Sequence, residues 1–240
     1  MSQKIKQHTS QSIGLDIAVD LANFATGKDN LHYGIWDGLD VNLGNLCLAQ
    51  EAYTKKLLSY LPKGKQLKIL DIGGGAGETA KELLSLGHKV TLIVPSSSLA
   101  SLAKKNTRNE AKIELCTFED YKPDHNELFD LCLFSESFQY IPLKLALKKA
   151  KKLLKNKGKV LVSDCFRSDA IKQKNLYRPP GGGHLLSEMY EEINLNSLRI
   201  ISSEEITQSV SGSIDLEQKF YNTIGSIFIR IKDSFSIKNP

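Results

Sequence analysis

Short apolar runs alternate with amphipathic segments through the middle of this 240-residue chain. The apolar runs are continuous rather than alternating, which is typical of parallel strands covered on both faces. The segments between them carry apolar residues at helical spacing. Strands are predicted at residues 67–72, 89–94, 112–115, 129–134 and 159–165, with helices at 76–86, 97–106 and 142–155. This alternation predicts an α/β fold built on a doubly wound, mostly parallel sheet.

Further elements are predicted on both sides of this core. Two helices near residues 11–25 and 43–60 precede it, and an aromatic loop at 32–38 separates them. A Pro-Gly loop follows the core, and the elements after it are a helix near 184–196, a strand near 198–201 and a helix near 215–231. We therefore expect an N-terminal helical cap with the aromatic loop (1–62), a Rossmann-like core (63–168), and a C-terminal part of the same domain with the substrate loop, a small helical cap and an edge strand (169–240).

The composition is that of a globular protein, with 41% hydrophobic and 25% charged residues. No apolar run reaches the roughly 18 residues of a membrane-spanning helix, and the polar start of the chain does not look like a signal peptide. A soluble, cytoplasmic protein is the expectation. The four cysteines lie at least 16 residues apart, so they form neither a paired zinc motif nor a compact disulfide framework, and no metal is expected.

The net charge of +5 comes from one segment. Residues 141–160 contain eight lysines and no acid, whereas the other 220 residues carry 24 basic and 27 acidic side chains. Apolar residues recur at helical spacing between these lysines, which predicts an amphipathic helix with a solvated basic face. We therefore expect no nucleic-acid partner and no integral membrane segment. A weak peripheral membrane contact through the helix between Lys144 and Lys159 stays open.

A glycine-rich turn follows the first predicted strand, in the sequence DIGGGAGE at residues 71–78. Glycines at such a turn permit positive φ and let the backbone approach a ligand closely. The dinucleotide fingerprint G-x-G-x-x-G does not fit, because Glu78 stands at its third glycine position and the acid precedes the first glycine. A tight strand-to-helix connection without a ligand is the plainer alternative.

The pattern D-x-G-x-G-x-G at this turn resembles the first motif of class I S-adenosylmethionine-dependent methyltransferases. The resemblance implies that S-adenosylmethionine is the cofactor and S-adenosylhomocysteine the product. It further implies that Asp71 orients either the turn or the methionyl amine. Gly73, Gly75 and Gly77 would then give room to the methionine and ribose portions of the cofactor.

Three other segments carry the resemblance over roughly residues 31–162. The stretch NLHYGIWD at 30–37 is similar to one that precedes the core in small-molecule methyltransferases related to cyclopropane-fatty-acid synthases and to the tocopherol, sterol, sarcosine and glycine-betaine enzymes. It implies cofactor contacts for Tyr33 and Trp36, although an aromatic cluster that packs the N-terminal helices would look the same. Residues 129–141 resemble the family's fourth strand and place Ser135 and Glu136 at its end. Residues 154–162 resemble its L-K-P-G-G-x-L-x-V segment.

Two positions depart from the family pattern. The second strand ends at Val94, followed by Pro95 and Ser96, where the family has an acid for the ribose hydroxyls. Thr117 stands where an Asp accepts from the adenine amino group, although the next residue, Phe118, still offers its backbone amide to the ring. Each lost acceptor is worth roughly 1.5–3 kcal/mol, unless neighbouring hydroxyl groups compensate. The sequence also leaves no clear room for the seventh strand that the family usually has.

Glu136, His32 and His184 are the candidate catalytic bases, since methyl transfer requires alignment and sometimes proton removal. Glu136 as a capping residue and His184 as a helix-start residue are the structural alternatives. The sequence therefore predicts transfer of a methyl group to an O, N or C atom of a small-molecule acceptor, with lipid-like and polyketide-type molecules as the candidate classes. The alternative function is a methyltransferase-fold protein without methyl transfer, which binds a ligand or regulates a partner. The oligomeric state is not predicted.

Overall fold

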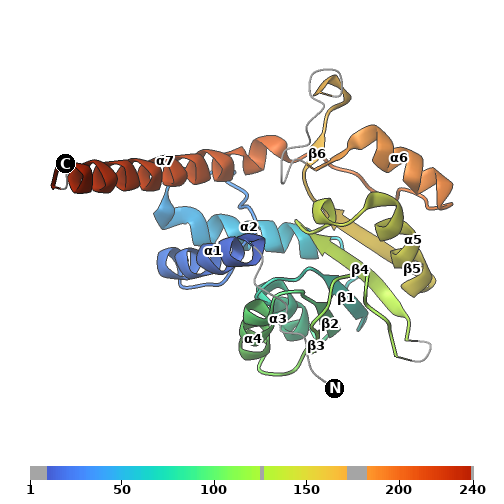
Figure 1. Cartoon of the computed structure of the whole chain (residues 1–240). Coiled ribbons are helices and arrows are strands. Elements are labelled where there is room, and N and C mark those ends of the chain that lie inside the picture. The colour runs from blue at the N-terminus through green and yellow to red at the C-terminus, as the bar shows by residue number, and fades with distance from the viewer. Residues whose placement is uncertain (1–9, 125–126, 172–182, 239–240) are drawn as a thin grey trace. The chain divides into compact units, whose positions relative to one another are not determined.

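A computed structural model describes residues 10–124, 127–171 and 183–238 (Figure 1). Residue contacts divide the chain into two compact units. The first unit comprises Met1–His32 and Leu58–Ser203, and the second comprises Tyr33–Leu57 and Glu204–Pro240. The predicted boundaries at residues 62 and 168 follow chain order and stay a prediction. The Pro-Gly loop predicted at 177–183 lies, apart from Gly183, outside the described residues.

The first unit is built on a five-stranded sheet in the order β3-β2-β1-β4-β5, with every neighbouring pair parallel. Its strands are β1 (Lys68–Ile72), β2 (Lys89–Ile93), β3 (Lys112–Glu114), β4 (Phe129–Ser135) and β5 (Leu154–Ser163). Its helices are α1 (Ser10–Thr26), α3 (Glu78–Ser85), α4 (Ser97–Asn106), α5 (Leu143–Leu153) and α6 (Leu186–Leu195), and the short β6 (Phe166–Arg167) pairs with β7 (His184–Leu185). This architecture confirms the predicted doubly wound, mostly parallel sheet.

The core of this unit explains the continuous apolar runs. The central strands β1 and β4 bury both faces, so that Ile69, Leu70 and Leu133 have no exposed surface. Phe134 lies at the centre of an aromatic cluster. Its ring meets those of Phe118 and Phe138 edge to face, at centroid distances of 5.7 and 5.0 Å.

The connection between α5 and β5 differs from the prediction of a helix up to residue 155 and a strand from 159. The helix ends at Leu153, and the strand begins directly at Leu154. Leu154 pairs with Phe129, but the next pair joins Lys159 to Leu131, so residues 155–158 bulge from the ladder. Positive φ at Lys157 closes this bulge.

Several lysines of the basic segment bind neighbouring parts of the first unit. Lys149 donates to the carbonyl oxygens of Glu119 and Tyr121 at 3.0 and 2.6 Å. Lys155 forms a 2.8 Å ion pair with Asp130. These contacts give part of the positive charge a structural role and leave less of it for an anionic partner.

The second unit contains η1 (Leu43–Asn45), α2 (Leu46–Leu58) and α7 (Thr207–Lys238). The last residue of α2, Leu58, is counted in the first unit. The aromatic loop packs against α7 through Trp36, whose Nε1 donates to the Ser213 hydroxyl at 2.8 Å. The Gly34 amide donates to the same oxygen at 2.8 Å. Gly212 makes this approach possible, because a Cβ there would lie 2.9 Å from the Trp36 ring. These contacts of Trp36 are with the C-terminal helix α7, whereas the packing alternative named the N-terminal helices.

Two predictions for the C-terminal part are wrong. Residues 198–201 form no strand, because the chain turns back on α6, where the Leu198 amide donates to the carbonyl of Ile193 at 3.0 Å. Positive φ at Ser197 makes this turn. The last helix is not confined to 215–231 but runs for 32 residues as α7. Within the described residues, the main sheet therefore has five strands and no edge strand from this part of the chain.

Candidate functional site

The glycine turn joins the carboxyl end of β1 to α3 in the first unit. Gly73, Gly75 and Gly77 all have positive φ, at 73°, 55° and 82°. A Cβ on Gly73 would lie 2.5 Å from the Cβ of Ser137, and one on Gly77 would lie 3.0 Å from the backbone of Ala103. A Cβ on Gly75 would meet nothing within 4 Å. Gly73 and Gly77 are thus needed for packing, whereas Gly75 borders open space.

Asp71 lies underneath this turn in the middle of the sheet. Its side chain has no exposed surface, and neither carboxylate oxygen has a hydrogen-bond partner among the described residues. Burial raises the pKa of this carboxyl group from 3.8 to about 7. A Cβ on Gly74 would collide with the carboxylate, so the acid and the turn fit closely. Both predicted roles of Asp71, orienting the turn or the methionyl amine, stay predictions, because its carboxylate bonds to neither backbone nor side chain among the described residues.

The loop after β2 places the first departing residue inside the protein. Val94 is only 1% exposed, and its amide donates to the carbonyl of Glu114 at 3.0 Å. Ser96 caps α4, because its hydroxyl accepts from the Leu99 amide at 3.3 Å and contacts the Ser98 hydroxyl at 2.7 Å. The exposed Pro95 lies between them. The hydroxyl of Ser96 therefore already has a structural task.

The loop after β3 contains the second departing residue. The Thr117 hydroxyl donates to the Asp120 carboxylate at 3.0 Å and accepts from the Asp120 amide at 3.2 Å. Asp120 is exposed and was not among the predicted site residues, although it is an acid three positions after Thr117. Phe118 is buried, and its ring packs on Phe134.

The end of β4 holds Ser135 and Glu136. Glu136 has φ of 53°, a conformation that costs a non-glycine residue roughly 1–2 kcal/mol. Its amide donates to the Ser163 carbonyl at 2.8 Å, which fixes the strand end to β5. The Ser135 hydroxyl is buried without a hydrogen-bond partner among the described residues. Strain of this kind clusters at functional sites, so it supports the choice of Glu136 as a candidate.

Asp164, the first residue after β5, belongs to the same edge of the sheet. Its carboxylate accepts from the amides of Gln139 and Cys165 at 3.1 and 2.7 Å. Burial raises its pKa to about 6, against the opposing effect of these hydrogen bonds. The sequence prediction missed Asp164 because it extended the strand to residue 165. An end at 163 makes this acid a loop residue, at the position where such sheets place their chemistry.

His184 lies near this edge but is held by the backbone. Its Nε2 is 3.2 Å from the carbonyl oxygen of Phe138 and 3.0 Å from that of Ile141. Two carbonyl acceptors require a proton on this nitrogen, so a role as base falls to the other ring nitrogen. That role stays a prediction. His32 is half-buried in the first unit, whereas Tyr33 and Trp36 belong to the second unit.

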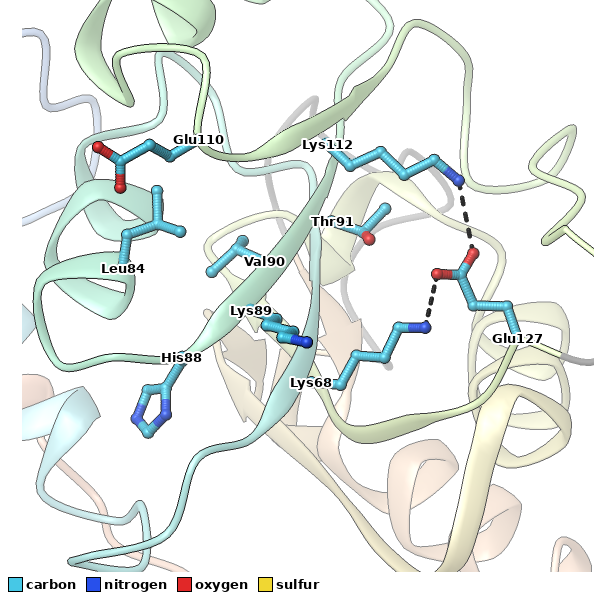
Figure 2. A pocket seen from close by; sticks show the side chains of 9 residues that line it. All are labelled: Lys68, Leu84, His88, Lys89, Val90, Thr91, Glu110, Lys112 and Glu127. Carbon is cyan, nitrogen blue, oxygen red and sulfur yellow. Dashed lines mark ion pairs between the residues drawn. The ribbon is translucent and has the colours of Figure 1, made fainter.

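A cavity of about 450 Å³ lies at the opposite edge of the sheet, where β1, β2 and β3 begin (Figure 2). The first residues of these strands, Lys68, Lys89 and Lys112, contribute to its wall. Glu127 pairs with Lys68 at 2.8 Å and with Lys112 at 3.5 Å, as Figure 2 shows. Lys112 also pairs with Glu114 at 3.0 Å and with Asp124 at 2.6 Å, so two of the three lysines have acidic partners. The cavity is remote from the strand ends that carry the predicted site.

The described residues contain no group of three or more His, Cys, Asp or Glu side chains placed to hold a metal ion. None of the described helices is both long and apolar enough to cross a membrane.

Comparison with known protein families identifies the segment that holds the glycine turn. Residues 70–162 match a family model described as a methyltransferase domain. This segment is a methyltransferase domain. The match runs from β1 into β5 and covers Asp71, the glycine turn and the ends of β2 to β4. It confirms the predicted family and, at that level, the expectation of an S-adenosylmethionine-dependent methyltransferase. Among curated proteins, no match was found.

Solved structures share the fold of this methyltransferase domain and its flanking parts. The [4+2]-cyclase SpnF aligns with a TM-score of 0.70 at 18% identity, over 85% of this chain and 77% of its own. A second structure is a geranyl diphosphate C-methyltransferase from Streptomyces coelicolor A3(2) in complex with Mg²⁺, geranyl-S-thiolodiphosphate and S-adenosyl-L-homocysteine. It aligns with a TM-score of 0.71 at 16% identity, over 88% of this chain and 87% of its own. The cyclopropane synthase MmaA2 from Mycobacterium tuberculosis aligns with a TM-score of 0.67 at 16% identity, over 93% of this chain and 82% of its own. At these identities the comparison shows a common fold.

Proposed function

We propose that this protein transfers a methyl group from S-adenosylmethionine to a small-molecule acceptor and releases S-adenosylhomocysteine. The observation that carries the proposal is the glycine turn of the methyltransferase domain. Its outer glycines are packed so tightly that they fix the backbone, while Gly75 between them borders open space. A turn that is rigid on both sides and open in the middle suits close approach of a ligand to the backbone.

The described residues fit the two ends of this cofactor unequally. At the methionine end, the open backbone at Gly75 and the unpartnered carboxylate of Asp71 beneath the turn agree with the family pattern. At the adenosine end, Val94 is a buried apolar residue, and the hydroxyl of Thr117 is bonded to Asp120. We therefore infer that the methionine end supplies more of the binding energy in this protein than in a relative that keeps both acids.

The chemistry of the proposed reaction divides between cofactor and protein. S-adenosylmethionine, when bound, supplies an electrophilic methyl group. The glycine turn would hold and orient it, and the residues at the ends of β4 and β5 would position the acceptor. Where the acceptor atom carries a proton, Glu136 or Asp164 would take that proton as the new bond to carbon forms. The acidity of Asp164 suits this role, because its raised pKa of about 6 lies near neutrality.

A calorimetric titration with S-adenosylmethionine and S-adenosylhomocysteine tests the proposal. Gly75→Arg should abolish binding, because its side chain fills the open space beside the turn. Gly87→Arg is the matched control, since Gly87 also has positive φ and open surroundings but lies just before β2, at the amino edge of the sheet. No binding of either ligand to the wild-type protein at millimolar concentration would refute the proposal.

The acceptor is proposed from the similarity in fold alone. One of the structures with this fold is a geranyl diphosphate methyltransferase in complex with its isoprenoid substrate, and another is a cyclopropane synthase. We accordingly propose a lipid-like or polyketide-type acceptor, methylated at O, N or C, in a cytoplasmic protein. Transfer of a labelled methyl group to extracted small molecules, with heat-treated protein as control, would identify the acceptor. Label in protein or nucleic acid instead would contradict a small-molecule acceptor.

A second function is favoured by Val94 and Thr117, namely a methyltransferase fold that binds a ligand without methyl transfer. SpnF, described as a cyclase, shows that this fold accompanies other chemistry. Restoring the acids with Thr117→Asp and Val94→Asp separates the two functions. A gain of about tenfold or more in S-adenosylmethionine affinity, as one recovered charged hydrogen bond would give, favours a decayed cofactor site. A loss of affinity, with unchanged thermal stability, favours a remodelled site that is in use.

A further inference from the structure

The second unit ends in a helix that is much longer than its packing requires. Helix α7 has 32 residues, which corresponds to about 48 Å (Figure 1). Its amino-terminal part is anchored by Gly212 and Ser213, which are buried against the aromatic loop. Beyond this anchor, apolar residues remain exposed. Ile227 and Ile231 are each 46% exposed, and Phe228 is 66% exposed.

Ile227 and Ile231 belong to one apolar stripe along α7, and Phe228 lies beside it. Phe220, Ile224, Ile227 and Ile231 follow one another at intervals of four, three and four residues, the spacing of a helix-pairing seam. Leu216 extends the stripe by one turn toward the anchor. The half-buried part of the stripe comprises Leu216, Phe220 and Ile224, and the exposed part begins at Ile227.

The acidic and basic residues along the stripe are separated, with the acid toward the amino-terminal end and the bases toward the carboxyl-terminal end. Glu217 lies within the stripe near its amino-terminal end, and Arg230 and Lys232 flank its carboxyl-terminal end on either side. Neither Glu217 nor Arg230 forms an ion pair within the described part of the chain. Partial desolvation raises the pKa of Glu217.

We propose that α7 pairs with α7 of a second copy of this chain in an antiparallel arrangement. A pairing centred between Thr223 and Ile224 places Leu216 opposite Ile231 and Phe220 opposite Ile227. The same register places Glu217 of each copy opposite Arg230 of the other. Each contact then occurs twice, as a twofold symmetric interface requires.

Other arrangements leave these charges unmatched. A parallel pair would bring Glu217 next to Glu217 and Arg230 next to Arg230, which is repulsive. A membrane surface would take up the apolar residues together with Arg230 and Lys232, but it would also draw the acid Glu217 into the apolar layer. The antiparallel pair satisfies the apolar stripe and the charges with the same register.

Sedimentation velocity over a wide range of protein concentration tests the proposal. The wild-type protein should change from one to two copies as its concentration rises. Ile227→Asp should weaken this association by about tenfold or more, because it puts a charge in the centre of the apolar contact. Asn222→Asp is the matched control, since it adds the same charge to an exposed residue on the opposite side of α7, and it should leave the association unchanged.

A charge exchange tests the antiparallel register. Glu217→Arg alone and Arg230→Glu alone should each weaken association, whereas the double variant should restore it because both pairs are formed again with reversed sign. A wild-type protein that stays a single copy at every concentration would overturn the proposal. So would a double variant weaker than both single variants. Flotation with phosphatidylserine vesicles that Ile227→Asp abolishes, without self-association, would assign the stripe to a membrane instead. Circular dichroism shows whether each variant retains its helix.

Discussion

The strand ends of the methyltransferase domain differ in how closely their residues match the family's cofactor-binding pattern. At the end of β1, the acid and all three glycines of the pattern are present, and Gly73 and Gly77 are packed closely against their neighbours. At the ends of β2 and β3, Val94 and Thr117 replace acids, and each is integrated into local structure. Side chains that face a ligand can change without loss of the fold, whereas a turn packed on its neighbours cannot.

The residues at the two ends of the proposed cofactor site therefore have different physical explanations. The turn after β1 is required by the fold itself, because Gly73 lies against Ser137 of the loop after β4. Gly73 and Gly77 therefore report on packing, and the evidence for a ligand comes from the open backbone between them. Val94 and Thr117 stand where the family pattern has acids that contact the ligand, so these two positions bear more directly on ligand binding. The open surroundings of Gly75, which packing does not require, are the better indicator within the turn.

The largest effect should come from Gly73→Ala. The added methyl group collides with Ser137 and must also adopt positive φ, so we expect the free energy of unfolding to fall by about 3–5 kcal/mol. Gly75→Ala also adopts positive φ but meets no neighbour, so it should cost about 1 kcal/mol. Urea unfolding followed by circular dichroism measures both. Equal costs for the two variants would show that packing does not maintain the turn, and the contrast would fail.

The sequence alone predicted the part of the fold that depends on local pattern. The five parallel strands and α3, α4 and α5 follow from continuous apolar runs and helical spacing, so their existence was predictable, with ends displaced by a few residues. The turn after Ser197 and the length of α7 were not, since a polar, Ser-rich sequence at 207–215 gives no sign of a long helix.

Predicting the site had a similar limit. Asp71 and the glycines were found because adjacent residues along the chain form the motif. Asp164 was missed because its importance comes from burial and from amides of Gln139 and Cys165, which folding brings to it. The packing of Trp36 on Ser213 joins residues 177 positions apart, and no local pattern reveals such a contact.

The next largest effect should be the pH dependence caused by Asp71. Its pKa is 3.8 in the unfolded chain and about 7 in the folded protein, so the folded state binds the proton more tightly. The contribution of this carboxyl group to the free energy of unfolding is fully present below about pH 4 and is lost as pH rises toward 7. The loss is about 4 kcal/mol at most, since each pKa unit corresponds to roughly 1.4 kcal/mol.

Asp71→Asn removes this titration, because the amide stays neutral. Relative to the wild type, the variant should therefore gain stability on going from about pH 5 to about pH 8. Urea unfolding at both values measures the difference, and Asp120→Asn is the matched control, since it makes the same substitution at an exposed position. If Asp71→Asn and the wild type share one pH profile, Asp71 is already compensated in the folded protein. The close fit of acid and turn would then need another explanation.

The smallest effect concerns Ser96, which lies in the loop after β2 beside Val94, one of the two positions without the family's acid. Its hydroxyl caps α4, so Ser96→Ala should lower the free energy of unfolding by about 1 kcal/mol. If the cap is its only task, the affinity for S-adenosylmethionine should not change, and Ser96→Asp, which also caps helices, should restore stability. Calorimetric titration beside urea unfolding separates the two properties. An affinity that falls in Ser96→Ala although stability changes little would mean that Ser96 compensates for the acid missing at Val94, and the two sides of the site would then differ less than their residues suggest.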